Sequence, residues 1–182
     1  GHVGGAAGGT LGAAVGAKAR ADGHFLTFGS TSTHVVAPSV YTKLEYDPIK
    51  DFAPISLIGV SPYLLVVNPA LPARSLKELV DLARKQPGKL NYASAGVGST
   101  THLAMEMLKV ASNTYMLHIP YNGNGPAGTA VMGGQVEILF GSLPPQLPHA
   151  NSGGLRALAV GTLVHAPSMP DIPTVAESGY PG

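Results

Sequence analysis

LNYASAGVGSTTHLAMEMLKVASNTYMLHIPYNGNGPAGTAVMGGQVEILF, residues 90–140, decides the fold because one unit occurs in it twice. Each unit consists of a short apolar strand, a loop of small residues and a helix. The pieces are 90–93, 94–100 and 101–111, then 115–119, 120–125 and 126–132, and a third strand follows at 136–140. Strands that alternate with helices at this spacing predict βαβ units around a parallel sheet.

The sequence outside this stretch predicts further elements of the same α/β class. Ser75 to Glu78 is a capping box, in which the Ser75 hydroxyl accepts the Glu78 N–H and the Glu78 carboxylate reaches back, so a helix is predicted from 75 to 86. The other predictions are a helix at 10–21, a strand at 24–28, a turn at 47–54, two strand pieces within 55–67, a short helix or turn ending at 149, a strand at 155–160 and a proline-rich linker at 164–173.

Composition and charge exclude several classes of protein. The chain has 182 residues, is 45% apolar and only 12% charged, which argues against intrinsic disorder. The net charge is +1 and the basic residues are scattered, so no nucleic-acid partner is expected. No apolar run is long enough to span a membrane. There are no cysteines, which excludes disulfides and thiolate metal sites and is compatible with an oxidising compartment.

The loop SAGVGST, residues 94–100, precedes a predicted helix and could bind an anion. The N-terminus of a helix offers unpaired N–H groups and partial positive charge, and glycines let a ligand approach the backbone. The alternative is that glycine and serine only shape a tight turn and cap the helix. The sequence leaves these two interpretations open.

The loop GNGPAG, residues 123–128, matches the pattern G-x-G-x-x-G after a strand and before a helix. A dinucleotide site also needs an acidic residue about 20 positions further on, and none lies near Pro148. An α/β enzyme that binds a nucleotide or phosphate at this loop is therefore the alternative function. A carboxylate or another small anion at the helix N-terminus fits better.

No other pattern points to catalysis, a metal or a cofactor. The seven histidines include no pair three to five residues apart, so no zinc site is expected. There is no G-x-S-x-G motif, and we predict that the chain is not an enzyme. His102, in the first helical turn after SAGVGST, is expected to cap or pack rather than bind a ligand. The predicted loops contain no arginine, so a bound acid would be held by backbone N–H groups, hydroxyls and waters.

Taken together, the motifs resemble the Bug family, the extracytoplasmic solute receptors of tripartite tricarboxylate transporters. The resemblance covers essentially the whole chain. Its motifs are YDPIKDF at 46–52, PGKLNYASAGVGSTTH at 87–102, PYNGNGPA at 120–127, GGQV at 133–136 and PTVAESGYPG at 173–182.

The resemblance implies a periplasmic binding protein with two α/β lobes and parallel-rich sheets, which closes like a flytrap on a small carboxylic acid. Residues 61–162 would form the second lobe, and residues 1–60 with 163–182 would form part of the first. The ligand would be a dicarboxylate, a tricarboxylate or a similar acid. The chain would deliver it in the periplasm to the membrane subunits of the transporter, without a cofactor.

The resemblance also implies ligand contacts from both lobes. The first lobe would supply Ser32 and Thr33 from its hydroxyl-rich run. The second lobe would supply two groups of residues from its loops: Ser94, Gly96, Gly98, Ser99 and Thr100, then Tyr121, Gly123, Pro126 and Ala127.

The sequence departs from the family pattern at three places. The usual first strand with its glycine-rich loop is expected before Gly1, and the usual C-terminal helices are expected after Gly182, so the chain is interpreted as truncated. Apolar surface left uncovered by these segments could form a dimer. Gly141 stands where many members have an Asp, which leans against an amino-acid ligand.

Overall fold

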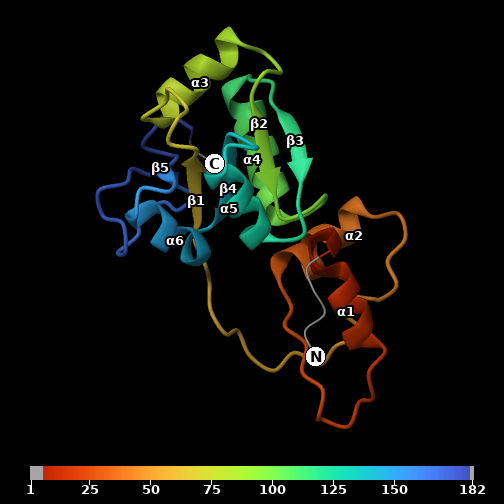
Figure 1. The fold of residues 1–182 in the computed structure, drawn as a ribbon. Coiled ribbons are helices and arrows are strands. Elements are labelled where there is room, and N and C mark those ends of the chain that lie inside the picture. The colour runs from red at the N-terminus through yellow and green to blue at the C-terminus, as the bar shows by residue number, and fades with distance from the viewer. Residues whose placement is uncertain (1–5, 181–182) are drawn as a thin grey trace.

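The computed structural model describes residues 6–180, in which five strands form one sheet in the order β3-β2-β4-β1-β5 (Figure 1). The strands are β1 (Tyr63–Val67), β2 (Asn91–Ser94), β3 (Leu117–Pro120), β4 (Ile138–Ser142) and β5 (Arg156–Val160). β2 pairs in parallel with β3 and β4, whereas β1 pairs antiparallel with β4 and β5. Four strands therefore run in one direction, as the alternation of strands and helices predicts, and β1 runs in the other.

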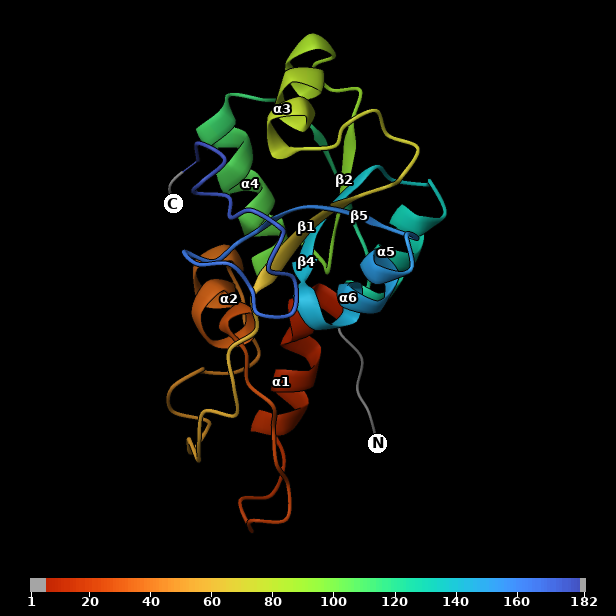
Figure 2. The ribbon, with the colours of Figure 1, turned by 90° about the vertical axis from the view of Figure 1, so that its left-hand side faces the viewer.

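Helices cover both faces of this sheet (Figure 2). They are α3 (Leu76–Lys85), α4 (Thr100–Ser112), α5 (Asn124–Met132) and α6 (Leu143–Asn151). Side chains of α3 and α4 share one hydrophobic cluster with the sheet, and side chains of α5 and α6 share another. The result is a three-layer α/β sandwich, which confirms the predicted fold class.

β1 lies at the centre of both clusters. Its side chains alternate, so that Leu65 and Val67 face the α3 and α4 cluster while Leu64 and Val66 face the other. All four are completely buried. A strand covered on both faces is a continuous apolar run, and this is how residues 63–67 appear in the sequence.

The capping box at the start of α3 forms with one difference. The Ser75 hydroxyl accepts the Glu78 N–H at 3.2 Å, as predicted. The Glu78 carboxylate accepts the N–H of Arg74 at 2.7 Å instead of the N–H of Ser75. The reciprocal bond therefore reaches one residue further back along the chain.

The N-terminal segment, residues 6–62, lies beyond the end of the sheet to which β2 and β3 point (Figure 1). It holds a 3₁₀ turn (Ala6–Gly9), α1 (Thr10–Ala17), a π-helical turn (Ser32–Val36) and α2 (Ala37–Val40). Its own core is small: Ala13, Ala14 and Tyr46 are buried, with Phe52 packed against them. The helix predicted over 10–21 ends at Ala17.

Two predicted strands are wrong. Residues 24–28 form no strand, and only residues 63–67 of the predicted pieces within 55–67 do. The side chains of Phe28 and Ile58 are 76% and 80% exposed. An isolated extended segment has no neighbour to pair its backbone N–H and C=O groups, so β propensity alone does not make it a strand.

Residues 163–180 contain turns and one isolated bridge between Val160 and Thr174. Ala166, Met169 and Ile172 nevertheless pack against the α5 and α6 cluster. The sequence GHVGGAAGGT, residues 1–10, predicts a loop, of which residues 1–5 lie outside the described range. Within residues 6–180, every helix is too short or too polar to cross a lipid bilayer.

Candidate functional site

Both predicted ligand loops lie at one edge of the sheet, at the carboxyl ends of the parallel strands. The loop 95–99 leads from β2 to α4, and the loop 121–123 leads from β3 to α5. β1 begins at this edge because it runs in the opposite direction, and its first residue, Tyr63, pairs with Ser142 at the end of β4. In open α/β sheets this is the edge where ligands bind.

The N-terminal segment meets the same edge. Ser32 Oγ accepts the N–H of Thr100 at 3.0 Å and lies 3.1 Å from the Thr100 hydroxyl. The Tyr41 hydroxyl donates to the carbonyl of Val97 at 2.5 Å. Gly98 has a φ of +71°, and a Cβ there would lie 3.1 Å from the Tyr41 ring. Two sets of predicted site residues, 68 positions apart in sequence, are therefore in direct contact.

The serines of the first loop bond to the loop itself. Ser99 caps α4, since its hydroxyl accepts the N–H of His102 at 3.3 Å and donates to the carbonyl of Gly96 at 2.7 Å. The Ser94 hydroxyl accepts the N–H of Gly96 and donates to its carbonyl, both at 3.1 Å. Both serines are buried. These contacts are those of the turn-and-cap interpretation, and they fix the position of the backbone of Gly96.

A second group of hydroxyls lies where the N-terminal segment touches the sheet. Thr100 Oγ1 contacts the hydroxyls of both Ser32 and Tyr63. Thr33 is buried, and its hydroxyl donates to the Ser30 carbonyl at 3.1 Å. Sequence reasoning missed Tyr63, because only the antiparallel direction of β1 brings its first residue to this edge.

The start of α5 differs from the start of α4. Gly123, with a φ of +112°, precedes α5, and in the described chain no side chain caps this helix. The N–H of Ala127 donates to the carbonyl of Gly123 at 3.3 Å, and Pro126 is exposed. The N–H of Tyr121 donates to the carbonyl of Ser94 at 3.0 Å and so joins the two loops. The first amides of α5 therefore lack the hydroxyl partner that α4 has.

Behind the first loop lies a group of ring and charged side chains that the sequence analysis did not assemble. The rings of His102 and His118 stack with centroids 4.0 Å apart, and Tyr92 stacks on His118 at 5.0 Å. Glu106 accepts hydrogen bonds from the Tyr92 hydroxyl and from Lys109 Nζ. His102 packs here, as predicted. Part of this group could have been predicted from the sequence, because Tyr92 and His118 lie in two predicted neighbouring strands. In the structure they are paired residues on parallel strands.

Burial controls the ionisation of this group. It lowers the pKa of His118 to about 4 and also holds the pKa of His102 below its ordinary value. Burial raises the pKa of Tyr92. Burial alone would raise the pKa of Glu106, but hydrogen bonds from Lys109 and Tyr92 keep it below its ordinary range. Both imidazoles are thus neutral at pH 7.

The space beside Gly141 is filled from a neighbouring helix. A Cβ at Gly141 would lie 3.0 Å from Asn124 Oδ1, the first side chain of α5. That oxygen and Gln146 Oε1 of α6 are buried without a hydrogen-bond partner. Within residues 6–180 no three histidine or acidic side chains form a group that could hold a metal.

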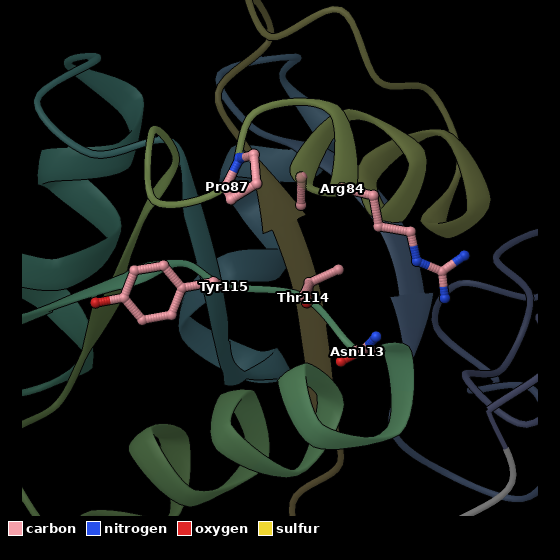
Figure 3. A pocket seen from close by; sticks show the side chains of 6 residues that line it. Arg84, Pro87, Asn113, Thr114 and Tyr115 are labelled. Atoms are coloured by element: carbon pink, nitrogen blue, oxygen red, sulfur yellow. The ribbon is translucent and has the colours of Figure 1, made fainter.

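Two cavities open on the sheet and α4, and one of them is lined in part by Tyr63, whose hydroxyl contacts Thr100. One, of about 360 Å³, is at the opposite edge of the sheet and is lined by residues that include Arg84, Pro87 and Tyr115 (Figure 3). Arg84 donates there to the carbonyl of Ser112 at the end of α4. The other, of about 470 Å³, is a largely apolar groove along α4 that includes Met107.

Curated proteins match nearly the whole of this chain. A protein from the tcbD–tcbE intergenic region of a Pseudomonas species is 38% identical over 96% of this chain and 52% of its own length. Protein BugT of Bordetella pertussis is 36% identical over 96% of this chain and 54% of its own length. The chain therefore spans about half the length of the curated relatives that it matches.

Solved structures also match nearly the whole of this chain and little more than half of their own length. An R. palustris protein with adipate is 35% identical, with a TM-score of 0.93, over 96% of this chain and 58% of its own. MatC from Rhodopseudomonas palustris with bound malate is 34% identical, with a TM-score of 0.90, over 96% and 60%. The periplasmic binding protein BugD is 33% identical, with a TM-score of 0.87, over 97% and 58%.

BugD is a periplasmic binding protein, and the sequence profile that matches this chain describes a family of receptors rather than of enzymes. The sequence profile described as the tripartite tricarboxylate transporter family receptor matches residues 4–182. That match covers nearly the whole chain and includes both loops at the carboxyl edge of the sheet. This chain belongs to the family of tripartite tricarboxylate transporter receptors.

Proposed function

We propose that the chain is part of a periplasmic receptor that captures a small carboxylic acid for a tripartite tricarboxylate transporter. One observation carries the proposal: Ser32 of the N-terminal segment contacts Thr100 at the N-terminus of α4. This contact joins the two regions that would enclose a ligand in a two-lobe receptor. Relatives that were solved with adipate and with malate support a carboxylate as the ligand.

The proposed ligand-site residues are those predicted from the sequence. We expect some of them to contact the carboxylate and others to fix the shape of the loop. The uncapped amides at the start of α5, with Gly123 and Tyr121 beside them, would receive a carboxylate directly. At α4 the Thr100 N–H is held by Ser32. A carboxylate oxygen is a stronger acceptor than a hydroxyl and would replace it there. The buried Ser94 and Ser99 would act by shaping the loop.

The division into lobes is part of this proposal. Residues 61–162 would form one lobe, and residues 1–60 with 163–182 would belong to the other. The contacts of Ala166, Met169 and Ile172 with the sheet favour a boundary further along the chain than residue 163.

The exposed side chains of Phe28 and Ile58 favour association of the N-terminal segment with a second copy of the chain. Sedimentation at increasing concentration would detect this association as a dimer.

The first test is a thermal-melt screen of the chain against mono-, di- and tricarboxylic acids, with a nucleotide as control. A ligand at 100 times its Kd stabilises the folded state by about 2.7 kcal/mol. For a domain of this size we expect a rise in Tm of about 5–11 °C. A rise with one acid alone supports the receptor function, and a rise with the nucleotide alone contradicts it.

A matched pair of variants then tests the site. Thr100→Val removes the hydroxyl at the junction and keeps the side-chain shape, so affinity for the acid should fall about 2- to 10-fold. Thr114→Val removes a comparable half-buried, hydrogen-bonded hydroxyl at the opposite edge of the sheet, and affinity should stay unchanged. Equal affinities of the two variants for the acid would show that the Thr100 hydroxyl does not contribute to binding.

A further inference from the structure

The loop 94–99 is attached at two points to a pair of imidazoles from two different elements. His118 of β3 places Nε2 2.6 Å from Ser94 Oγ. His102 of α4 accepts the N–H of Gly98 at Nδ1, over 3.3 Å. The two rings stack with an interplanar angle of 11° and centroids 4.0 Å apart. Both ends of the loop are therefore fixed by a single stack.

The hydrogen bonds define which nitrogens carry protons. The Gly98 N–H can donate only to an unprotonated Nδ1, so His102 must be neutral. The Ser94 hydroxyl already accepts from and donates to the backbone of Gly96, which leaves the Nε2–H of His118 as donor to Ser94. A proton added to His102 Nδ1 would face the Gly98 N–H and break that bond.

The groups that face the stack do not compensate a charge on both rings. Glu106 of α4 lies 3.8 Å from His102 Nε2, but its carboxylate is already paired with Lys109 at 2.6 Å. Lys109 also lies 5.3 Å above the ring of Tyr92, the β2 residue that stacks on His118. Two imidazolium rings at 4.0 Å would repel each other, and among the described residues Glu106 is the one carboxylate within 4 Å of either ring nitrogen.

We propose that His102 and His118 are positioning residues for the ligand loop. As a neutral stack they hold Ser94 and Gly98 in place and so fix the shape of the loop, and protonation at acid pH releases the loop. The inference rests on the proposed function only where it says that the loop receives the ligand. The attachment of the loop to the stack can be tested without any ligand.

The sign of the pH effect follows from the two lowered pKa values. An imidazole that resists protonation in the folded state is protonated more readily in the unfolded chain, near its ordinary pKa of about 6.5. The stabilisation is complete above about pH 6.5. It is lost as the pH falls towards about 4, where His118 itself protonates in the folded state.

The first experiment follows the amide signals of Gly96 and Gly98 by NMR in the ligand-free chain between pH 8 and pH 4. The Gly98 amide should shift with the titration of His102 in the wild type. It should stay in place in His102→Asn, whose side-chain oxygen accepts the same N–H but does not titrate. His149→Gln on α6, outside the stack, should behave as the wild type. A Gly98 amide that titrates equally in His102→Asn overturns the proposal.

The second experiment compares two substitutions by their affinity for adipate and malate at a single pH, so that protonation of the ligand cancels. His102→Phe keeps a ring in the stack but removes the acceptor, and affinity should fall about 5- to 10-fold. His102→Asn should remain within about 2-fold of the wild type. Equal losses in both variants would mean that the ring only packs.

The two experiments separate the possible failures. If the wild-type chain binds none of the acids of the thermal-melt screen, the proposed function fails while the Gly98 titration still decides whether the stack holds the loop. If His102→Phe does not fold, His118→Gln replaces it. This variant keeps a donor for Ser94 without a titrating ring, so its unfolding free energy should fall less than that of the wild type between pH 6.5 and pH 4. A parallel fall in both overturns the proposal.

Discussion

The sheet and the N-terminal segment are both rich in β-forming residues, yet only the sheet is ordered by pairing. In β1 all the side chains from Leu64 to Val67 are completely buried. Ile58 and Val60, a few residues earlier in the same apolar run, are 80% and 87% exposed. The difference lies in the neighbours, since β1 enters between β4 and β5 while residues 53–61 have no strand beside them. Strand propensity becomes structure only where a partner strand is available.

Hydrogen exchange would test this comparison with the largest expected contrast. Amides in the middle of β1 should exchange only through global unfolding, which for a domain of this kind requires about 5–15 kcal/mol. Amides of residues 53–61 should exchange almost as fast as in an unfolded peptide. Slow exchange at residues 53–61 in the isolated chain would show that this segment has a partner, and a concentration series would show whether the partner is a second copy.

Truncation of side chains should give the next largest contrast. Leu65→Ala leaves a cavity in the cluster that β1 shares with α3 and α4, so the free energy of unfolding should fall by about 2–5 kcal/mol. Leu26→Ala removes a similar side chain that is 74% exposed, and the change should stay within about 0.5 kcal/mol. Urea unfolding of the two variants measures both values. A large loss at Leu26 would mean that the segment packs against something in solution.

The sequence predicted the sheet well and the N-terminal segment poorly for the same reason. The helices after β2 and β3 begin within two residues of their predicted starts, because glycine-rich loops and capping residues are local signals. The strand predicted over 24–28 was wrong, because pairing is not local. The antiparallel direction of β1 could not be predicted from the sequence either. For this reason the position of Tyr63 at the candidate site was not predicted.

The candidate site divides in a similar way. The sequence placed both loops at one edge, and the structure adds which of their hydroxyls are already engaged. Ser94 and Ser99 are buried and bonded to their own loop. The stack of His102 on His118 joins residues from α4 and β3, and no sequence pattern predicts stacking between them. Whether the proposed residues bind a ligand stays a prediction.

The caps of α4 offer a smaller and more local contrast between the two regions. Ser99→Ala removes the N-cap supplied by the loop between β2 and α4, so the free energy of unfolding should fall by about 1 kcal/mol. Ser32→Ala removes only the partner that the N-terminal segment brings to Thr100, so the fall should be smaller. Thermal melts of both variants measure this. A larger loss from Ser32→Ala would mean that the N-terminal segment contributes more to α4 than the loop does.

The C-terminal segment provides the smallest expected effect. It has little regular structure, but His165 connects two of its turns: Nδ1 lies 2.5 Å from the Pro170 carbonyl and Nε2 lies 2.9 Å from Glu177. Both partners are acceptors, so the doubly protonated ring is favoured. The Pro170 carbonyl first, and then Glu177, raise the pKa of His165 above its ordinary value.

The replacement Glu177→Gln should move the pKa of His165 part of the way back, because the Pro170 carbonyl remains. NMR titration of the imidazole signals measures the change. The contribution of this contact to stability is complete below about pH 6.5 and is lost as the pH rises through the raised pKa, opposite to the sign expected for His118. Because both side chains are exposed, unfolding curves of the variant and the wild type should nearly coincide. An unchanged pKa of His165 in Glu177→Gln would leave the Pro170 carbonyl as the sole cause of the raised value.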